Sequence, residues 1–156
     1  MISKPLFSII TCTLNSEQSI ARNINSVSNQ TFKNHEHIFI DGNSRDKTLK
    51  IINKYKRQNP SSIKLFKAKP QGISHAMNLG ILNAGGKYII HLHSDDYFYD
   101  NKVLEDVNKY LIKSPDLDFK VQRAFYAPSY GKKKPTNCIR AYVPCATIKV
   151  GITIEF

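Results

Sequence analysis

The feature that most constrains the fold of this chain is a regular alternation of short apolar runs with longer segments that are apolar on one side. Four runs rich in β-branched residues have the length of buried strands, at residues 6–12, 37–41, 63–66 and 88–92. After each run, apolar residues recur at spacings of three and four, which is typical of an amphipathic helix. The sequence therefore predicts four strands and four helices in strict succession.

Such an alternation predicts an α/β fold, with a mostly parallel sheet and helices on both of its faces. The carboxyl ends of parallel strands meet at one edge of a sheet, and ligands bind beyond that edge. Polar clusters lie at the ends of three predicted strands, at residues 11–15, 41–46 and 93–96. The sequence therefore predicts one binding site built from these three loops.

Two adjacent carboxylates, Asp95 and Asp96, stand just after the fourth predicted strand. Neighbouring like charges at a sheet edge are unfavourable unless a cation or ligand neutralises them. A divalent metal ion that carries phosphate oxygens is the simplest partner, and Mg²⁺ or Mn²⁺ prefers oxygen ligands. The alternative is a helix cap with an exposed acid. Together with Asp41, the pair points to a nucleotide-diphosphate site.

The other two polar loops suggest contacts with the same ligand. Asp41 directly follows the second predicted strand, and we expect it to accept a hydrogen bond from a base N–H or a ribose hydroxyl. Ser44 and Asp46 are interpreted as turn and capping residues. Segment 69–78 is typical of a turn before a helix, where free N–H groups bind anions, or equally of an ordinary turn. Asn78 lies one turn into that helix and is expected to face the site.

Net charge limits the possible partners. The 156 residues contain 23 Lys and Arg against 12 Asp and Glu, a net charge of +11. Residues 119–156 carry seven of the basic residues and one acid, and the regular pattern of residues 1–118 fades there. We therefore divide the chain into a binding half (1–118) and a basic tail (119–156). The tail is interpreted first as a solvated surface and next as a contact with an anionic membrane; nucleic acid is the least favoured partner.

Cysteine content and hydropathy favour a cytoplasmic protein. Cys12, Cys138 and Cys145 are widely spaced and fit neither a disulfide framework nor a zinc site. No stretch approaches the ~20 apolar residues of a membrane helix, and the first residues lack the pattern of a signal peptide. We therefore expect a reduced, cytoplasmic setting, with any membrane contact peripheral and at the inner face.

Five motifs together resemble the family 2 glycosyltransferases, in particular bacterial members that build cell-surface polysaccharides. They are FSIITCTLN at 7–15, QTFKNHE at 30–36, DGNSRD at 41–46, GISHAMNLG at 72–80 and GKYIIHLHSDD at 86–96. The motifs occur in the family's order and cover about residues 5–113. The resemblance implies the Rossmann-like GT-A fold. It also implies inverting transfer of a sugar from a nucleotide-sugar, often a UDP-sugar, to a glycan or lipid-linked acceptor, with Mn²⁺ or Mg²⁺.

The resemblance also implies roles for single residues. Asp41 would contact uracil or an equivalent base, Gly72 and Asn78 would border the ribose and the donor, and Asp95 and Asp96 would bind metal and diphosphate. The remaining residues of the nucleotide-sugar pocket would be Thr11, Thr13, Asn15, Glu17 and Ser94.

The chain departs from the family pattern at three points. Cys12 stands where the first motif usually has Pro, and His93 stands where many members have Asp and others Asn. The family also uses a later Asp or Glu as general base, because an alcohol is a poor nucleophile until its proton is removed. Between Phe119 and Ile154 there is no carboxylate, so the sequence does not identify a general base.

Two alternatives to an active transferase remain. The missing base favours a truncated, non-catalytic nucleotide-sugar-binding remnant. The basic tail favours a surface-binding protein in which Lys132–Lys134 engage anionic lipid or nucleic acid. The first alternative keeps the donor site and loses the transfer. The second predicts salt-sensitive binding that does not involve the acidic loops.

Overall fold

The computed structural model describes residues 4–113 and 141–142, and it contains the four predicted strands and four predicted helices in the predicted order. Outside β5, the tail predicted over 119–156 lies beyond the described residues, as do Cys138 and Cys145. No described helix has the length and hydropathy needed to cross a membrane. The elements are β1 (Phe7–Thr13), α1 (Ile20–Ser28), β2 (His35–Asp41), α2 (Thr48–Gln58), β3 (Ile63–Lys67), α3 (Ile73–Leu82), β4 (Tyr88–His91), α4 (Val103–Lys113) and β5 (Ala141–Tyr142).

The strands form one sheet in the order β3-β2-β1-β4-β5. The pairs among the first four strands are parallel, and β5 is antiparallel to β4. β2 and β3 lie on one side of β1 and β4 lies on the other, so the strand order reverses at β1. The loops that follow β1 and β4 therefore lead away from each other. That divergence is the usual ligand position in an open α/β sheet. The predicted mostly parallel α/β fold is confirmed.

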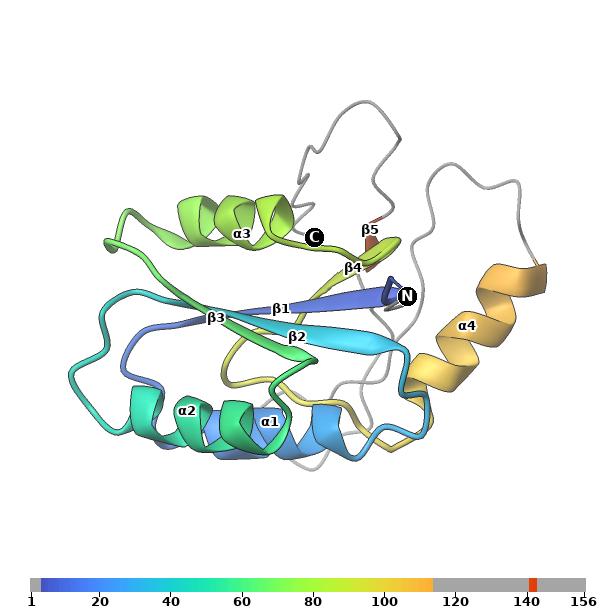
Figure 1. The fold of residues 1–156 in the computed structure, drawn as a ribbon, viewed down its shortest axis with the longest axis horizontal. Coiled ribbons are helices and arrows are strands. Elements are labelled where there is room, and N and C mark those ends of the chain that lie inside the picture. Colours follow the sequence, from blue (N-terminus) through green and yellow to red (C-terminus); the bar gives the residue numbers. More distant parts are fainter. Residues whose placement is uncertain (1–3, 114–140, 143–156) are drawn as a thin grey trace.

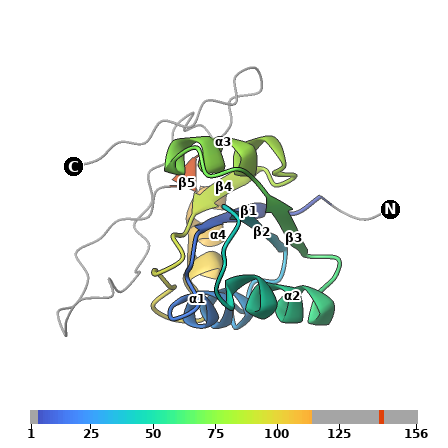
Figure 2. The same cartoon turned by 90° about the vertical axis from the view of Figure 1, so that its left-hand side faces the viewer.

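Helices cover both faces of the sheet. α1 and α2 lie side by side beneath it and α3 lies above it (Figures 1 and 2). Neighbouring residues of β1 point to opposite faces: Ile9 packs with α1 and α4, and Ile10 packs under Ile81 of α3. A third apolar cluster joins α1 and α2 to β2 and β3. Burial of β1 on both faces explains why its sequence is apolar without alternation.

The amino-terminal edge of the sheet is closed by a buried acid. Glu36 of β2 accepts hydrogen bonds from the Ser8 hydroxyl (2.6 Å) and the Gly85 N–H (2.6 Å), and its other oxygen lies 2.8 Å from Lys64 Nζ. Ser8 Oγ in turn accepts the N–H of Gly86 at 2.8 Å. Burial raises the pKa of Glu36, but the hydrogen bonds from Lys64, Ser8 and Gly85 outweigh it, and the net pKa is lowered. Both carboxylate oxygens of Glu36 therefore have partners within the protein.

Candidate functional site

A cavity of about 340 Å³ opens at the carboxyl edge of the sheet, the edge that faces the viewer in Figure 2. Its volume lies within the usual range for small-molecule sites. All three predicted loops contribute to it, as does the β3–α3 turn. The lining residues are Cys12, Thr13, Leu14, Ser16, Ile40, Gly42, Ala68, Lys69, Pro70, Gln71, Gly72, Ile73, Ala76, His93, Ser94 and Asp95.

Asp41 lies directly behind this lining. Its side chain is fully buried, and its partner in the β1–β2 register is Thr13. One carboxylate oxygen accepts the hydroxyls of Thr13 (2.9 Å) and Ser44 (2.6 Å), and the other accepts the Ser44 N–H (2.9 Å). An ionised carboxylate offers about four acceptor positions, so these bonds occupy most of them. Asp41 therefore fixes the cavity wall formed by Thr13 and Gly42.

Asn15 and Glu17 join the β1–α1 loop to the β2–α2 loop. Asn15 has a positive φ of 51°, which is the left-handed conformation that asparagine tolerates better than most residues. Both side chains accept backbone N–H groups of the other loop, and neither lines the cavity. Asn15 Oδ1 accepts the Arg45 N–H (2.9 Å), and Glu17 Oε2 accepts the Lys47 N–H (2.8 Å). In the other direction, the Asn15 N–H donates to Ser44 Oγ (2.9 Å), and the Glu17 N–H donates to Asp46 Oδ2 (3.0 Å).

The N-cap position of α2 is Lys47, which makes no side-chain cap hydrogen bond, and Asp46 stabilises the helix start from one residue earlier. Its second oxygen, Oδ1, accepts the N–H of Thr48, the first residue of α2, at 2.9 Å. Ser44 forms the predicted turn with Asp41. The two loops are thus joined by hydrogen bonds on both sides, which fixes Thr13 and Gly42 in the cavity wall.

Thr11 lies deeper than the cavity lining. Its hydroxyl donates to the backbone carbonyl of Leu92 (2.8 Å), so its oxygen accepts from His37 Nε2 (2.9 Å). His37 is therefore the neutral Nε2–H tautomer, and burial, followed by the nearby charge of His35, holds its pKa well below the ordinary value. Thr11 joins the end of β4 to β1 and β2 beneath the site.

Only one of the two adjacent acids, Asp95, lines the cavity. Asp95 is exposed, whereas Asp96 is half-buried. Burial, and next the negative charge of Asp95, raise the pKa of Asp96, while His93 and Arg22 partly offset this. The pair therefore carries negative charge that its surroundings do not fully compensate.

Carboxylate oxygens are suitable ligands for a divalent metal ion, but two of them need substrate phosphate and water to complete its shell. Among the described residues no group of three or more His, Cys, Asp and Glu is arranged to hold a metal by itself. Mg²⁺ commonly binds one or two carboxylates together with phosphate oxygens and water. A nearby cation would lower the raised pKa of Asp96, because a positive charge favours the ionised carboxylate.

Asn23 of α1 holds the acidic loop, and the sequence analysis did not identify it. Its side chain is fully buried, and its Nδ2 donates to the carbonyls of His93 (2.9 Å) and Asp96 (3.1 Å). Its Oδ1 is buried without a partner. The signal was present, because Asn23 stands between Ile20 and Val27 on the apolar face of the helix. A polar residue there must bind something buried.

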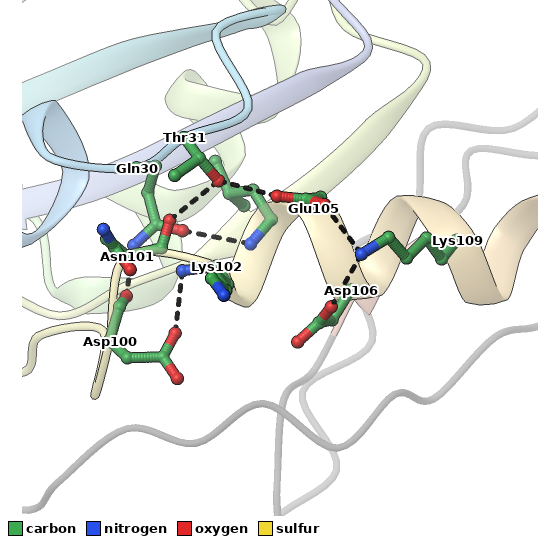
Figure 3. A network of polar contacts seen from close by, with 9 residues as sticks. Gln30, Thr31, Asp100, Asn101, Lys102, Glu105, Asp106 and Lys109 are labelled. Carbon is green, nitrogen blue, oxygen red and sulfur yellow. Dashed lines mark hydrogen bonds and ion pairs between the residues drawn. The ribbon is translucent and has the colours of Figure 1, made fainter.

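The segment just after α1 anchors the rest of the chain between β4 and α4. Gln30 donates to the Asp100 carbonyl (2.6 Å) and accepts the Leu104 N–H (3.0 Å). Next to it, the Thr31 hydroxyl lies 3.0 Å from Glu105, which is paired with Lys109 (2.7 Å). Figure 3 shows these contacts along the start of α4. The acidic loop is thus fixed at both of its ends.

The β3–α3 turn supplies the opposite side of the cavity. Gly72 lines it with a φ of 90°, which favours glycine, and α3 begins at the next residue without a side-chain cap. Asn78 is exposed and does not line the cavity. Two lining residues that the sequence did not single out, Leu14 and Ile73, are 54% and 52% exposed. Ser94 lines the cavity and accepts the Ser16 hydroxyl at 3.0 Å.

Comparison with known proteins decides the family. The sequence model described as "Glycosyl transferase family 2" matches residues 8–150. This chain belongs to glycosyltransferase family 2. The predicted family is therefore confirmed, and with it the expectation of a transferase fold.

Curated relatives are longer proteins. An "Uncharacterized glycosyltransferase" of Haemophilus influenzae is 36% identical over 107 residues, which are 69% of this chain and 43% of the relative. The "Minor teichoic acid biosynthesis protein GgaA" of Bacillus subtilis is 35% identical over 126 residues, which are 78% of this chain and 28% of GgaA. The chain thus spans less than half the length of these family 2 relatives.

Solved structures agree with the GT-A fold. S. aureus TarS 1–349 in complex with UDP-GlcNAc has a TM-score of 0.65 and 29% identity, over 70% of this chain and 32% of TarS. The mannosyltransferase PcManGT from Pyrobaculum calidifontis, in complex with GDP-Man and Mn²⁺, has a TM-score of 0.66 over 77% of this chain and 35% of that one. Its identity is 19%, so it supports the fold alone.

Proposed function

We propose that this family 2 chain binds a nucleotide-sugar, most simply a UDP-sugar, and contributes to inverting, metal-assisted transfer of the sugar to a glycan or lipid-linked acceptor. The carrying observation is the convergence of three strand-end loops and the β3–α3 turn on one cavity that contains Asp95. The UDP-GlcNAc complex of TarS, which shares the fold, supports this choice of donor.

The nucleotide is proposed to occupy the part of the cavity between the first two loops. Thr13 lines this part, and Asp41 holds the Thr13 hydroxyl from behind. Asp41 is then proposed to act on the base through the Thr13 hydroxyl, because its own side chain is fully buried behind the cavity lining. In this proposal Thr11, Asn15 and Glu17 serve the nucleotide by fixing the two loops, as their hydrogen bonds suggest.

The diphosphate is proposed to lie between the acidic loop and the β3–α3 turn. Asp95 and Asp96 would hold Mn²⁺ or Mg²⁺, which offsets the charge that develops on the leaving diphosphate. Ser94 and Gly72 line the same space, and the free N–H groups at the start of α3 favour an anion there. Asn78 is proposed to border the donor from further along α3.

Inversion by direct displacement requires a base on the acceptor hydroxyl. Among the described residues Asp95 is the only carboxylate in the cavity lining, and it is already assigned to the metal. We therefore assign no general base within the described residues. We also propose that residues 1–118 form the donor half, that 119–156 are distinct from it, and that the protein works in the cytoplasm at an anionic membrane.

A non-catalytic donor-binding remnant is the second candidate. It is favoured by one observation, the lack of any carboxylate between Phe119 and Ile154. Both candidates require the donor site, and they differ only in turnover. Binding of a UDP-sugar without transfer or hydrolysis would select the remnant.

The test is calorimetry of the full chain with UDP and UDP-sugars, in Mn²⁺ and in EDTA. We expect Asp95→Ala and the isosteric Asp95→Asn to abolish metal-dependent affinity. Asp106→Asn removes an exposed acid of α4, outside the cavity, and is the matched control. Unchanged metal-dependent affinity in both Asp95 variants would exclude the proposed metal role, and no binding by the unaltered chain would exclude both candidates.

A further inference from the structure

Positive charge in the described part of the chain is concentrated in one stretch. Residues 45–69 contain nine Lys or Arg and a single acid, Asp46. The other residues of 4–113 contain seven basic and eight acidic residues, which nearly balance. The stretch comprises α2, the edge strand β3 and their flanking loops. The excess charge therefore belongs to one side of the molecule, at the lower right in Figure 2.

On α2 this charge forms a single stripe, which we call the α2 face. Its residues are spaced by three, four and three positions, so they share one side of the helix. All four are exposed, whereas the opposite side of α2 packs into the core through Thr48, Ile52 and Tyr55. The α2 face consists of Lys47, Lys50, Lys54 and Arg57.

The arrangement is unfavourable for the isolated helix. Lys50 and Lys54 are like charges at i and i+4, which destabilise a helix. The first turn of α2 contains Lys50 and no acid, although the positive end of the helix dipole favours acids there. Among the described residues, the ion pairs involve Lys64 and Lys109 and none of the four residues of the face. Within the described residues, the charge of the α2 face is therefore left without a side-chain ion pair.

We propose that the α2 face binds the surface of an anionic lipid bilayer. A solvent-exposed row of three ammonium groups and one guanidinium suits a diffuse layer of anionic headgroups. A single-stranded nucleic acid is less suited, because its binding sites add exposed aromatic rings for base stacking. The one aromatic residue of α2, Tyr55, is 7% exposed and packs in the core.

The α2 face lies close to the cavity, so binding to a membrane through this face would affect where the cavity is held. Lys47 ends the β2–α2 loop, and Gly42 of that loop lines the donor cavity. A chain bound through α2 would hold the cavity beside the membrane, where a lipid-linked acceptor resides. In this respect the inference rests on the proposed function and names the face that meets the membrane. Lipid binding itself needs no donor and can be measured without one.

The test is flotation of the full chain with vesicles of phosphatidylcholine alone or of an equimolar mixture with phosphatidylglycerol. We expect binding to the mixed vesicles only, weakening as salt rises. Each cation near such a surface contributes about fivefold, so Lys50→Gln, Lys54→Gln and Arg57→Gln combined should lower the partition coefficient on the order of a hundredfold. Its melting temperature should stay the same or rise, because like charges are removed.

The matched control is Lys132→Gln, Lys133→Gln and Lys134→Gln combined, which removes the same charge from the tail. A clearly smaller loss in this control supports the proposal. Equal losses would assign binding to net charge, and a loss in the control alone would assign it to the tail; either result overturns the proposal. Tighter binding to single-stranded RNA than to mixed vesicles at equal phosphate also overturns it. Calorimetry with UDP and Mn²⁺ should be unchanged in the α2 variant, so failure of the donor site is recognised separately.

Discussion

Acids at the amino-terminal and carboxyl-terminal ends of the parallel strands have opposite electrostatic surroundings. At the amino-terminal edge, Glu36 is surrounded by donors and a lysine, and its pKa is lowered. At the carboxyl edge, burial and the neighbouring charge of Asp95 raise the pKa of Asp96. Arg22 donates a hydrogen bond to the backbone carbonyl of Asp95 at 3.3 Å, and its charge offsets the raised pKa of Asp96 only in part. An acid whose hydrogen bonds are all satisfied stabilises the fold, whereas an under-compensated acid next to a cavity, such as Asp96 beside Asp95, is a candidate for ligand binding.

The largest expected effect is a loss of stability when Glu36, at the amino-terminal end of the strands, is removed. Glu36→Ala leaves Lys64, the Ser8 hydroxyl and the Gly85 N–H without their acceptor, and we expect the free energy of unfolding to fall by about 3 kcal/mol. Urea denaturation of the full chain measures this loss. Glu105→Ala, which removes a partly exposed acid of the α4 ion pair, should cost much less. Equal losses in the two variants would contradict the difference drawn between the edges.

An intermediate effect is expected for Asn23, which holds the acidic loop at the carboxyl ends of the strands. Asn23→Ala removes the donors to the His93 and Asp96 carbonyls, and we expect a loss of about 1–2 kcal/mol. The metal-dependent affinity for UDP should fall roughly tenfold or more, because residues that orient metal ligands have effects of that size. Calorimetry and urea denaturation separate the two effects, with exposed Asn25→Ala as the control on the same helix. If stability falls while affinity is unchanged, Asn23 is purely structural.

The smallest effect is a difference in pH dependence. The folded-state pKa of Glu36 is lowered, so its stabilisation is present above its ordinary pKa of 4.5 and is lost as pH falls through the lower folded value. The folded-state pKa of Asp96 is raised, so its ionisation opposes folding as pH rises above its ordinary pKa of 3.8. Metal binding needs the ionised form and should therefore weaken in mild acid while the fold is still intact.

Melting curves and UDP–Mn²⁺ calorimetry at a series of pH values test this order of events. Asp96→Asn should lose metal-dependent binding and be slightly more stable than the unaltered chain at neutral pH, since it removes a disfavoured charge. Simultaneous loss of binding and of folded structure on acidification would contradict the prediction.

The fold could be predicted because its signals are local. Apolar runs such as residues 6–12 set the strands, and alternation with helices requires parallel pairing. Parallel pairing then brings Asp41 and Asp95 to the same edge without any knowledge of side-chain contacts. The antiparallel strand β5 was not placed, because a pairing of Ala141 and Tyr142 with β4 leaves no periodic signal in so short a segment.

The finer roles in the site could not be predicted in the same way. Asn15 and Glu17 bind backbone N–H groups about 30 residues away, and a backbone donor leaves no trace in the sequence. Thr11 and Thr13 lie two residues apart on one strand, yet one hydroxyl serves β4 and the other serves Asp41. The buried position of Asn23 was visible in the helical pattern, but its partners were not.

The anchoring of the acidic loop has a consequence for how the site can diverge. β4 pairs with β1 only as far as Ile10, and beyond that point Thr11 binds the Leu92 carbonyl while Asn23 binds those of His93 and Asp96. Every amino acid offers the same carbonyl, so these anchors do not depend on the side chains that the loop carries. The loop can therefore exchange its chemistry and keep its position, which explains how a histidine stands at residue 93, where many members of the family have an acid, without displacing the aspartates beside it.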